Sequence, residues 1–123
     1  MKLLLDTHIL LWWLADDAAL SDHVLDAISN PDNVVSVSAV SLWEIAIKRR
    51  LGKLDMPDDW ATHLAGEAFQ QLPITWRHAQ EVENLPTIHR DPFDRMLIAQ
   101  SRVEKLTLVT DDKTIRQYDV TML

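Results

Sequence analysis

The chain has 123 residues, of which 47% are hydrophobic and 25% charged, a composition typical of one globular domain, here residues 1–123. It contains no cysteine, so disulfides and thiolate metal sites are excluded. Any metal must therefore be held by oxygen or imidazole ligands, which favours a hard cation such as Mg²⁺ or Mn²⁺. The net charge of −7 argues against tight nucleic-acid binding by charge alone, but not against an enzyme that meets nucleic acid briefly.

The beginning of the chain superficially resembles a signal peptide, because Lys2 and an apolar stretch precede several alanines. Asp6 and His8 interrupt that stretch. The remaining apolar run, residues 9–15, is much shorter than the roughly 20 residues that cross a bilayer. We therefore expect a cytoplasmic protein that does not enter a membrane.

The first half of the sequence predicts two strands that are separated and followed by helices. The strands are short continuous apolar runs, and the helices have apolar faces bounded by cap and turn signals. In chain order the elements are a strand at residues 2–5, helices at 7–15 and 22–30, a strand at 34–37 and a helix at 41–51.

The second half of the sequence continues this alternation of strands and helices. Short apolar strands alternating with helices are typical of a parallel sheet that is covered on both faces. We therefore predict a three-layer α/β/α sandwich with a short, mainly parallel sheet. In chain order the elements are a helix after Pro57 within residues 56–71, a strand at 72–75, helices at 76–85 and 93–105, a strand at 106–110, a short helix at 112–118 and a candidate last strand at 120–123.

Carboxylates occupy equivalent places in this predicted fold. Asp6 ends the first strand, and Glu44 is expected in the first turn of the helix after the second strand. Asp94 begins the long helix, while Asp111 and Asp112 directly follow the fourth strand. Because ligands bind at the carboxyl ends of parallel strands, we expect these acids to gather at one edge of the sheet.

Each acid taken alone also has a simpler explanation as a helix cap. Ser41 and Glu44 have the spacing of a capping box. Asp91 can cap the long helix, with Pro92 at its first position and Asp94 facing the positive end of the helix dipole. Capping acids need not converge, however, and converging acids repel each other unless a cation lies between them. The combination therefore favours a metal site over capping alone.

Four segments of the chain together resemble a PIN domain, in particular the VapC-type toxin ribonucleases of bacterial toxin–antitoxin pairs. They occur in the order typical of that family and span nearly the whole chain. These segments are "LLLDTHILLWWL", "VSVSAVSLWEIAIKRRLGKL", "IHRDPFDRMLIAQS" and "LTLVTDDKTIRQYDV".

The resemblance implies a PIN-like fold in which Asp6, Glu44, Asp94 and Asp112 are the catalytic residues and hold Mg²⁺ or Mn²⁺. Asp112 is preferred to Asp111 because the family pattern reads Thr-x-Asp after the strand. The implied activity is metal-dependent cleavage of RNA by an activated water, which leaves 5′-phosphate and 3′-hydroxyl ends. The implied partners are an RNA substrate and a cognate antitoxin protein.

Other residues are candidates for supporting roles. Ser38 and Thr110 could hydrogen-bond a ligand carboxylate or a water molecule. His89 and Arg90 could touch phosphate, and Arg95 could pair with an acid at the start of its helix. His8, two residues after Asp6, could reach the site, but its place in an apolar helix favours a structural side chain.

The cluster Lys48, Arg49 and Arg50 is a candidate for RNA binding, although it also fits a solvated helix end before Gly52. The five tryptophans could stack on bases but mostly fit core or interface positions. The apolar N-terminal helix with Trp12 and Trp13 favours a homodimer.

Two other classes of function compete with a nuclease. A phosphoacceptor signalling domain is also a small acidic α/β fold that binds Mg²⁺, but it needs a lone phosphorylatable Asp and a late strand-end Lys. The predicted third and fourth strands end in "PITWR" and "VTDD", which does not fit. A non-catalytic PIN-like binding module is the second alternative, and the intact acid set argues against it.

Overall fold

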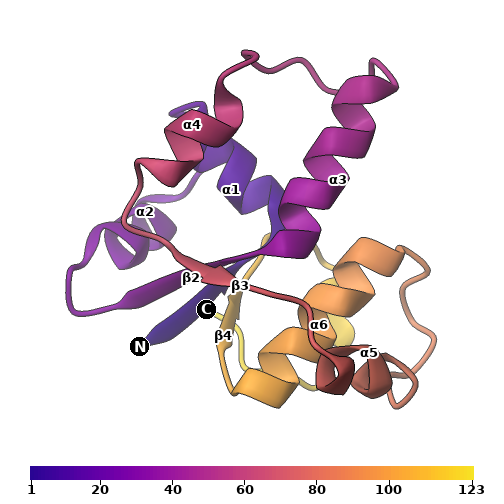
Figure 1. Ribbon diagram of the computed structural model, residues 1–123. Coiled ribbons are helices and arrows are strands. Elements are labelled where there is room, and N and C mark those ends of the chain that lie inside the picture. Colours follow the sequence, from indigo (N-terminus) through magenta and orange to yellow (C-terminus); the bar gives the residue numbers. More distant parts are fainter.

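A four-stranded, entirely parallel sheet forms the centre of the computed structural model, which describes all 123 residues (Figure 1). The inner strand β1 pairs with β2 on one side and with β4 on the other. The chain therefore leaves β1 in one direction, ends that half of the sheet at β3, and returns to the opposite side of β1. In spatial order the strands are β3 (Gln70–Leu72), β2 (Val34–Ser38), β1 (Lys2–Leu5) and β4 (Thr107–Val109).

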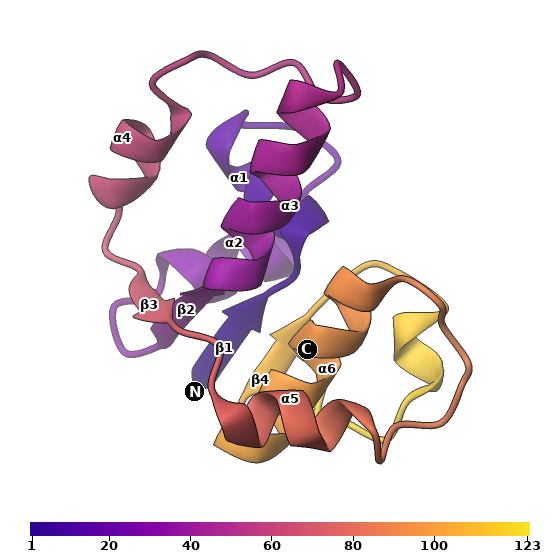
Figure 2. The same ribbon diagram turned by 45° about the vertical axis from the view of Figure 1, so that its right-hand side comes forward.

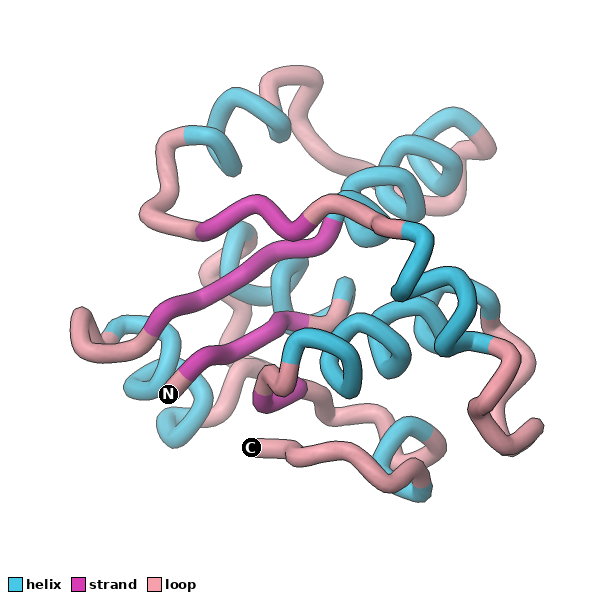
Figure 3. The backbone as a smooth tube through the Cα atoms, turned by 60° about the horizontal axis from the view of Figure 1, so that its bottom comes forward, coloured by secondary structure: helices cyan, strands magenta, loops and turns pink.

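Helices cover both faces of this sheet, and the strands run side by side between them (Figures 2 and 3). None of the helices has the length and apolar character that spanning a membrane requires. The helices are α1 (Thr7–Leu14), α2 (Asp22–Ser29), α3 (Ala39–Arg50), α4 (Trp60–Ala65), α5 (Trp76–Val82) and α6 (Pro92–Glu104), with a short 3₁₀ turn, η1 (Ile115–Gln117).

The alternating side chains of β1 divide the core into two halves. Leu3 and Leu5 pack into a cluster with Ile9 of α1 and Ile28 of α2. Leu4 points to the opposite face, where it joins a cluster that contains Leu97 and its neighbours on α6. Burying one such side chain stabilises the fold by about 1.5–3 kcal/mol. The three-layer sandwich predicted from the sequence is thus confirmed.

The third strand lies earlier in the chain than predicted. It covers Gln70–Leu72 instead of residues 72–75, and the helix before it is only Trp60–Ala65. As an edge strand that pairs with β2 alone, β3 keeps its two glutamines exposed and lacks the apolar run of a buried strand. Pro73, which has no N–H to donate, follows its last residue.

Helix α3 also begins earlier than predicted, at Ala39, because Ser38 and not Ser41 is its N-cap. The prediction that Glu44 lies in the first turn is therefore wrong, as is the Ser41 capping box. The hydroxyl of Ser41 accepts a hydrogen bond from that of Thr7 at 3.0 Å, which ties α3 to α1.

The C-terminal elements are shorter than predicted. The helix expected at residues 112–118 is only the 3₁₀ turn Ile115–Gln117. The candidate last strand is reduced to a single parallel bridge between Leu108 and Met122.

Candidate metal centre

Asp6 and Thr110 join the carboxyl ends of β1 and β4, the two strands between which the chain reverses its direction across the sheet. Asp6 Oδ1 accepts a hydrogen bond from the backbone N–H of Ile9 at 2.8 Å and so caps α1. Asp6 Oδ2 accepts a hydrogen bond from the Thr110 hydroxyl at 2.5 Å. The same hydroxyl oxygen accepts from the backbone N–H of Asp112 at 3.0 Å. Thr110 therefore has the hydrogen bond to a carboxylate that the sequence suggested.

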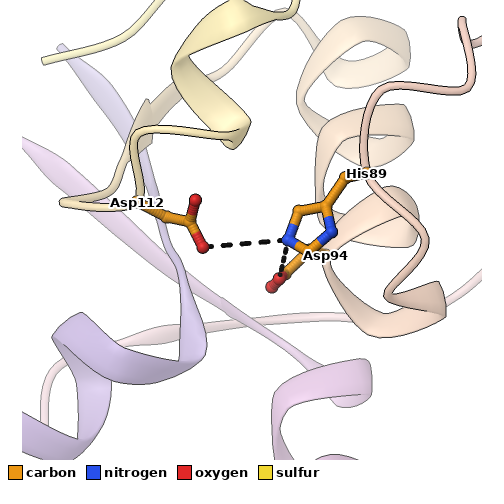
Figure 4. Close-up of side chains that lie close together, drawn as sticks. All are labelled: His89, Asp94 and Asp112. Carbon is orange, nitrogen blue, oxygen red and sulfur yellow. Dashed lines mark ion pairs between the residues drawn. The ribbon is translucent and has the colours of Figure 1, made fainter.

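Asp112 faces this site, whereas Asp111 is exposed. One carboxylate oxygen of Asp112 accepts from the backbone N–H groups of Thr114 and Ile115, at 2.7 and 3.2 Å. These bonds fix the side chain and leave its second oxygen free to face His89 (Figure 4). Asp112 is thus the acid that lies near His89 and Asp94, and its role as the ligand in place of Asp111 stays a prediction.

The two acids at the start of α6 have different roles: Asp91 caps the helix, and Asp94 belongs to the site. Asp91 Oδ1 accepts from the backbone N–H groups of Phe93 and Asp94, at 2.8 and 3.2 Å, so the predicted capping role of Asp91 is confirmed. With its backbone N–H satisfied in this way, Asp94 directs its side chain toward Asp112 and His89 (Figure 4).

His89 lies between Asp94 and Asp112. Its Nε2 atom is 2.8 Å from Asp94 Oδ2 and 3.7 Å from Asp112 Oδ2. The contact with Asp94 is close but not aligned as a hydrogen bond, so Nε2 is a buried nitrogen without a hydrogen-bond partner. One ligand atom from each of the three residues lies within 4.8 Å of the others. The sequence suggested a phosphate contact for His89 but not its place among the acids.

Glu44 approaches the site from α3. Its Oε2 atom accepts from Lys48 Nζ at 2.5 Å, and its Oε1 atom is buried without any partner. Leaving a buried polar atom unsatisfied costs about 1–3 kcal/mol, and more for a charged group. A ligand that brings positive charge to Glu44 would remove this cost.

Burial and neighbouring negative charges raise the pKa values of two of these acids, Asp94 and Asp6. Burial, followed by the charge of Asp91, raises the pKa of Asp94 to about 7; Glu44 and Asp6 add to the rise, and His89 opposes it. Burial also raises the pKa of Asp6, although the hydrogen bonds from Thr110 and Ile9 oppose this. Asp6, Glu44 and Asp94 are thus close enough to interact electrostatically. Oxygen ligands, an unpartnered carboxylate oxygen and mutual repulsion together fit a divalent cation.

Two predicted supporting residues make different contacts. The Ser38 hydroxyl donates to Gln100 Oε1 at 2.5 Å and reaches none of the four acids, because Ser38 is the buried cap of α3. Arg95 pairs with no acid, because its guanidinium donates instead to carbonyl groups of the segment before α6, including those of Pro86 and His89. Arg90 is exposed.

The basic cluster at the end of α3 does not form one free patch. Lys48 is bound to Glu44, and Arg49 donates to Asp58 Oδ1 at 2.7 Å. Arg50 is exposed. His8, expected to be a structural side chain, is exposed as well.

The tryptophans also divide into two groups. Trp12, Trp13 and Trp60 are half-buried and pack against the core cluster on the α1 side of the sheet. Trp43 and Trp76 are exposed. The homodimer suggested by Trp12 and Trp13 stays a prediction.

Comparison with known proteins agrees with this geometry. Residues 3–120 match the PIN domain family. The chain is 32% identical over 119 residues to Ribonuclease VapC22 of Mycobacterium tuberculosis, covering 94% of this chain and 90% of that protein. It resembles a chain in the crystal structure of VapBC2 from Rickettsia felis, with a TM-score of 0.75 and 14% identity, over 100% of this chain and 98% of that one. A chain of a toxin–antitoxin complex from Klebsiella pneumoniae has a TM-score of 0.61 and 21% identity, over 89% and 85% of the two chains.

The family match therefore covers the two strand ends and the two helices that supply the acids of the site. The chain belongs to the PIN domain family.

Proposed function

We propose that the protein is an endoribonuclease that depends on a divalent metal. The observation that carries this proposal is the group of acids at the carboxyl ends of β1 and β4, in which Glu44 Oε1 has no partner and Asp94 has a raised pKa. Such a group is costly unless a cation balances its charge. The identity with a ribonuclease of the same family supports RNA as the substrate.

In this proposal Asp6, Glu44, Asp94 and Asp112 hold Mg²⁺ or Mn²⁺. A cation bound by such acids lowers the pKa of a water molecule and offsets negative charge on the phosphate. The bond from Thr110 and the cap of α1 hold the carboxylate of Asp6 in one orientation. Lys48 holds one oxygen of Glu44 and leaves the other free.

His89 is best placed to respond when substrate arrives. Its Nε2 atom is buried 2.8 Å from Asp94 Oδ2 without an aligned hydrogen bond, so it can donate to a phosphate oxygen once the side chain turns toward the substrate. The backbone N–H of His89 donates to the Tyr118 hydroxyl at 2.6 Å, which helps to hold the loop in place.

We further propose that the protein is the toxin of a type II toxin–antitoxin pair, acts in the cytoplasm, and is blocked by a cognate antitoxin. The VapC name of the related ribonuclease supports this assignment. A homodimer is part of the same proposal.

Cleavage of an RNA oligonucleotide by purified protein tests the proposed activity. We expect cleavage in Mg²⁺ or Mn²⁺ that stops in EDTA and returns when excess metal is added. The products should carry 5′-phosphate and 3′-hydroxyl ends, because water and not the ribose 2′-hydroxyl attacks. Full activity in EDTA, or cyclic 2′,3′-phosphate ends, would contradict the metal-dependent mechanism.

A further inference from the structure

An exposed tryptophan stands beside the acids without a role in the chemistry described so far. Trp43 of α3 has 58% of its surface exposed. Its ring packs edge-to-face on that of Phe93, with centroids 5.2 Å apart and planes at 78°. Phe93 is half-buried and packs against the core cluster on the α6 side of the sheet. The edge contact therefore anchors the indole while much of its surface stays open to solvent.

The sequence places this aromatic pair at the edge of the candidate metal centre. Trp43 directly precedes Glu44, and Phe93 directly precedes Asp94. Helices α3 and α6, which carry the two rings, are in contact with each other. A phosphodiester positioned at the acids would thus bring a neighbouring nucleotide close to the indole.

The protein has few free positive charges to attract RNA phosphates, so a contact between RNA and this ring would matter more for affinity. The net charge is −7, and two of the three basic residues at the end of α3 are already paired, Lys48 with Glu44 and Arg49 with Asp58. Phosphate attraction is therefore weak, and affinity for a single-stranded substrate must draw on other contacts. Stacking on an aromatic ring is such a contact, because every base has a π-face.

We infer that Trp43 is a substrate-positioning residue that stacks on a base next to the scissile phosphate of the RNA. This inference rests on the proposed ribonuclease function and adds the residue that holds the nucleotide. We expect Trp43 to bind an unpaired base, because both faces of a base within a duplex are already stacked.

Trp76 supplies a matched control. It is even more exposed, at 90%, and lies at the start of α5. His78 in the same turn contacts Glu104 at the opposite end of α6 from Asp94. The ten helical steps from Asp94 to Glu104 correspond to roughly 15 Å at the helical rise. Trp76 thus tests the general effect of removing an exposed indole far from the acids.

The test compares Trp43→Ala, Trp43→Phe and Trp76→Ala in the full chain with single-stranded RNA oligonucleotides. We expect kcat/KM to fall about tenfold to a hundredfold for Trp43→Ala, the range that loss of one stacked base produces. Trp43→Phe should recover most of this loss, and Trp76→Ala should match wild type. The rise in melting temperature caused by Mg²⁺ should be unchanged in all three variants, which shows that Glu44 has kept its place.

Oligonucleotides with one abasic ribose at successive positions make the test specific. Wild type should lose kcat/KM at one position beside the cut, and Trp43→Ala should lose nothing further there, because the two changes remove the same contact. Equal losses in both proteins at every position would overturn the inference. So would unchanged kinetics for Trp43→Ala together with a change from dimer to monomer in sedimentation, which would assign the ring to contact with a second copy.

RNA binding separates this inference from the proposed activity. Fluorescence anisotropy with uncleaved RNA, measured on an Asp94→Asn background, should show weaker binding when Trp43→Ala is added but not when Trp76→Ala is added. That difference supports the stacking role even if wild type cleaves no RNA, an outcome that would contradict only the proposed function. Equal binding by both double variants would overturn the stacking role.

Discussion

Asp91 and Asp94 have opposite effects on stability although they are only three residues apart. Asp91 accepts two backbone hydrogen bonds at the start of α6. Asp94 makes an unaligned contact with His89 and is repelled by Asp91, Glu44 and Asp6. Asp91 stabilises its helix. The fold holds Asp94 close to other negative charges that repel it, which is typical of functional sites.

This difference predicts the outcome of two isosteric substitutions. Asp94→Asn should abolish RNA cleavage, because it removes a charge from the proposed metal site. Asp91→Asn should keep most activity and cost at most about 1 kcal/mol, because Asn also caps helices well. Cleavage rates and urea unfolding of both variants measure these effects. If Asp91→Asn instead abolishes both cleavage and Mg²⁺ binding, the two roles are reversed.

The pKa of Asp94 also predicts how stability depends on pH. The folded state keeps the proton up to about pH 7, whereas the free carboxyl loses it near its ordinary pKa of 3.8. Between these values the folded state binds more protons than the unfolded state, so this group lowers stability as pH rises. We therefore expect that, in EDTA, the free energy of unfolding of Asp94→Asn minus that of wild type rises from about pH 4 to pH 7 and is constant above that.

Asp111→Asn is the control for this pH profile, because it neutralises an exposed acid outside the site. Mg²⁺ competes with the proton on Asp94, so its affinity for wild type should rise between about pH 6 and pH 8. A difference between Asp94→Asn and wild type that does not vary with pH would show that Asp94 ionises as a free carboxyl does.

At the residue scale, sequence patterns predict the role of a residue when that role depends only on its neighbours in the chain. Asp91 as a cap follows from its position at a helix start, whereas the preference for Asp112 over Asp111 came from the resemblance to the PIN family, because both acids directly follow the strand. His89 beside Asp94 and Lys48 on Glu44 were missed. The place of His89 depends on how its loop docks on Tyr118, and no local pattern encodes that contact.

At the scale of elements, α3 is fixed by its cap and by a chain of buried polar contacts. The Ser38 hydroxyl accepts from the backbone N–H of Val40 at 3.1 Å and donates to Gln100 Oε1 on α6. Gln100 Nε2 donates to the carbonyl of Pro73 at 3.3 Å. This chain connects the helix that carries Glu44 to the helix that carries Asp94.

Ser38→Ala should therefore destabilise the protein by more than the loss of a cap alone. It removes the cap and also leaves Gln100 Oε1 buried without a donor, a combined cost of about 1.5–5 kcal/mol. Ser21→Ala is the matched control, because Ser21 caps α2 at an exposed position through one bond, worth about 0.5–1 kcal/mol. Urea unfolding compares the two, and equal losses would show that the contact with Gln100 contributes nothing.

Sequence patterns predict the buried strands of this sheet better than its exposed edge strand. The strands β1, β2 and β4 have apolar runs because they contribute buried side chains to the core. The edge strand β3 carries exposed glutamines, so its pairing with β2 has no hydrophobic signature. Its position depends on backbone hydrogen bonds, which side-chain patterns do not reveal.

At the scale of the whole molecule, the fold brings like charges together. The hydrophobic clusters on the two faces of the sheet fix the positions of the strands and helices. The carboxyl ends of β1 and β4 then place Asp6 and Asp112 in one site, and helices α3 and α6 add Glu44 and Asp94. Hydrophobic packing thus offsets the repulsion among the acids and keeps them together at a site that can bind a cation.

The most direct test of this account is the melting temperature of wild type and Asp94→Asn near pH 8, in EDTA and in Mg²⁺. In EDTA the variant should melt higher, by roughly 3–6 °C for each kcal/mol of repulsion removed. Mg²⁺ should raise the melting temperature of wild type and raise that of the variant much less, because ligand binding stabilises the native state in proportion to affinity. A wild-type melting temperature that is the same in EDTA and Mg²⁺, with a variant that is no more stable, would contradict a metal site at these acids.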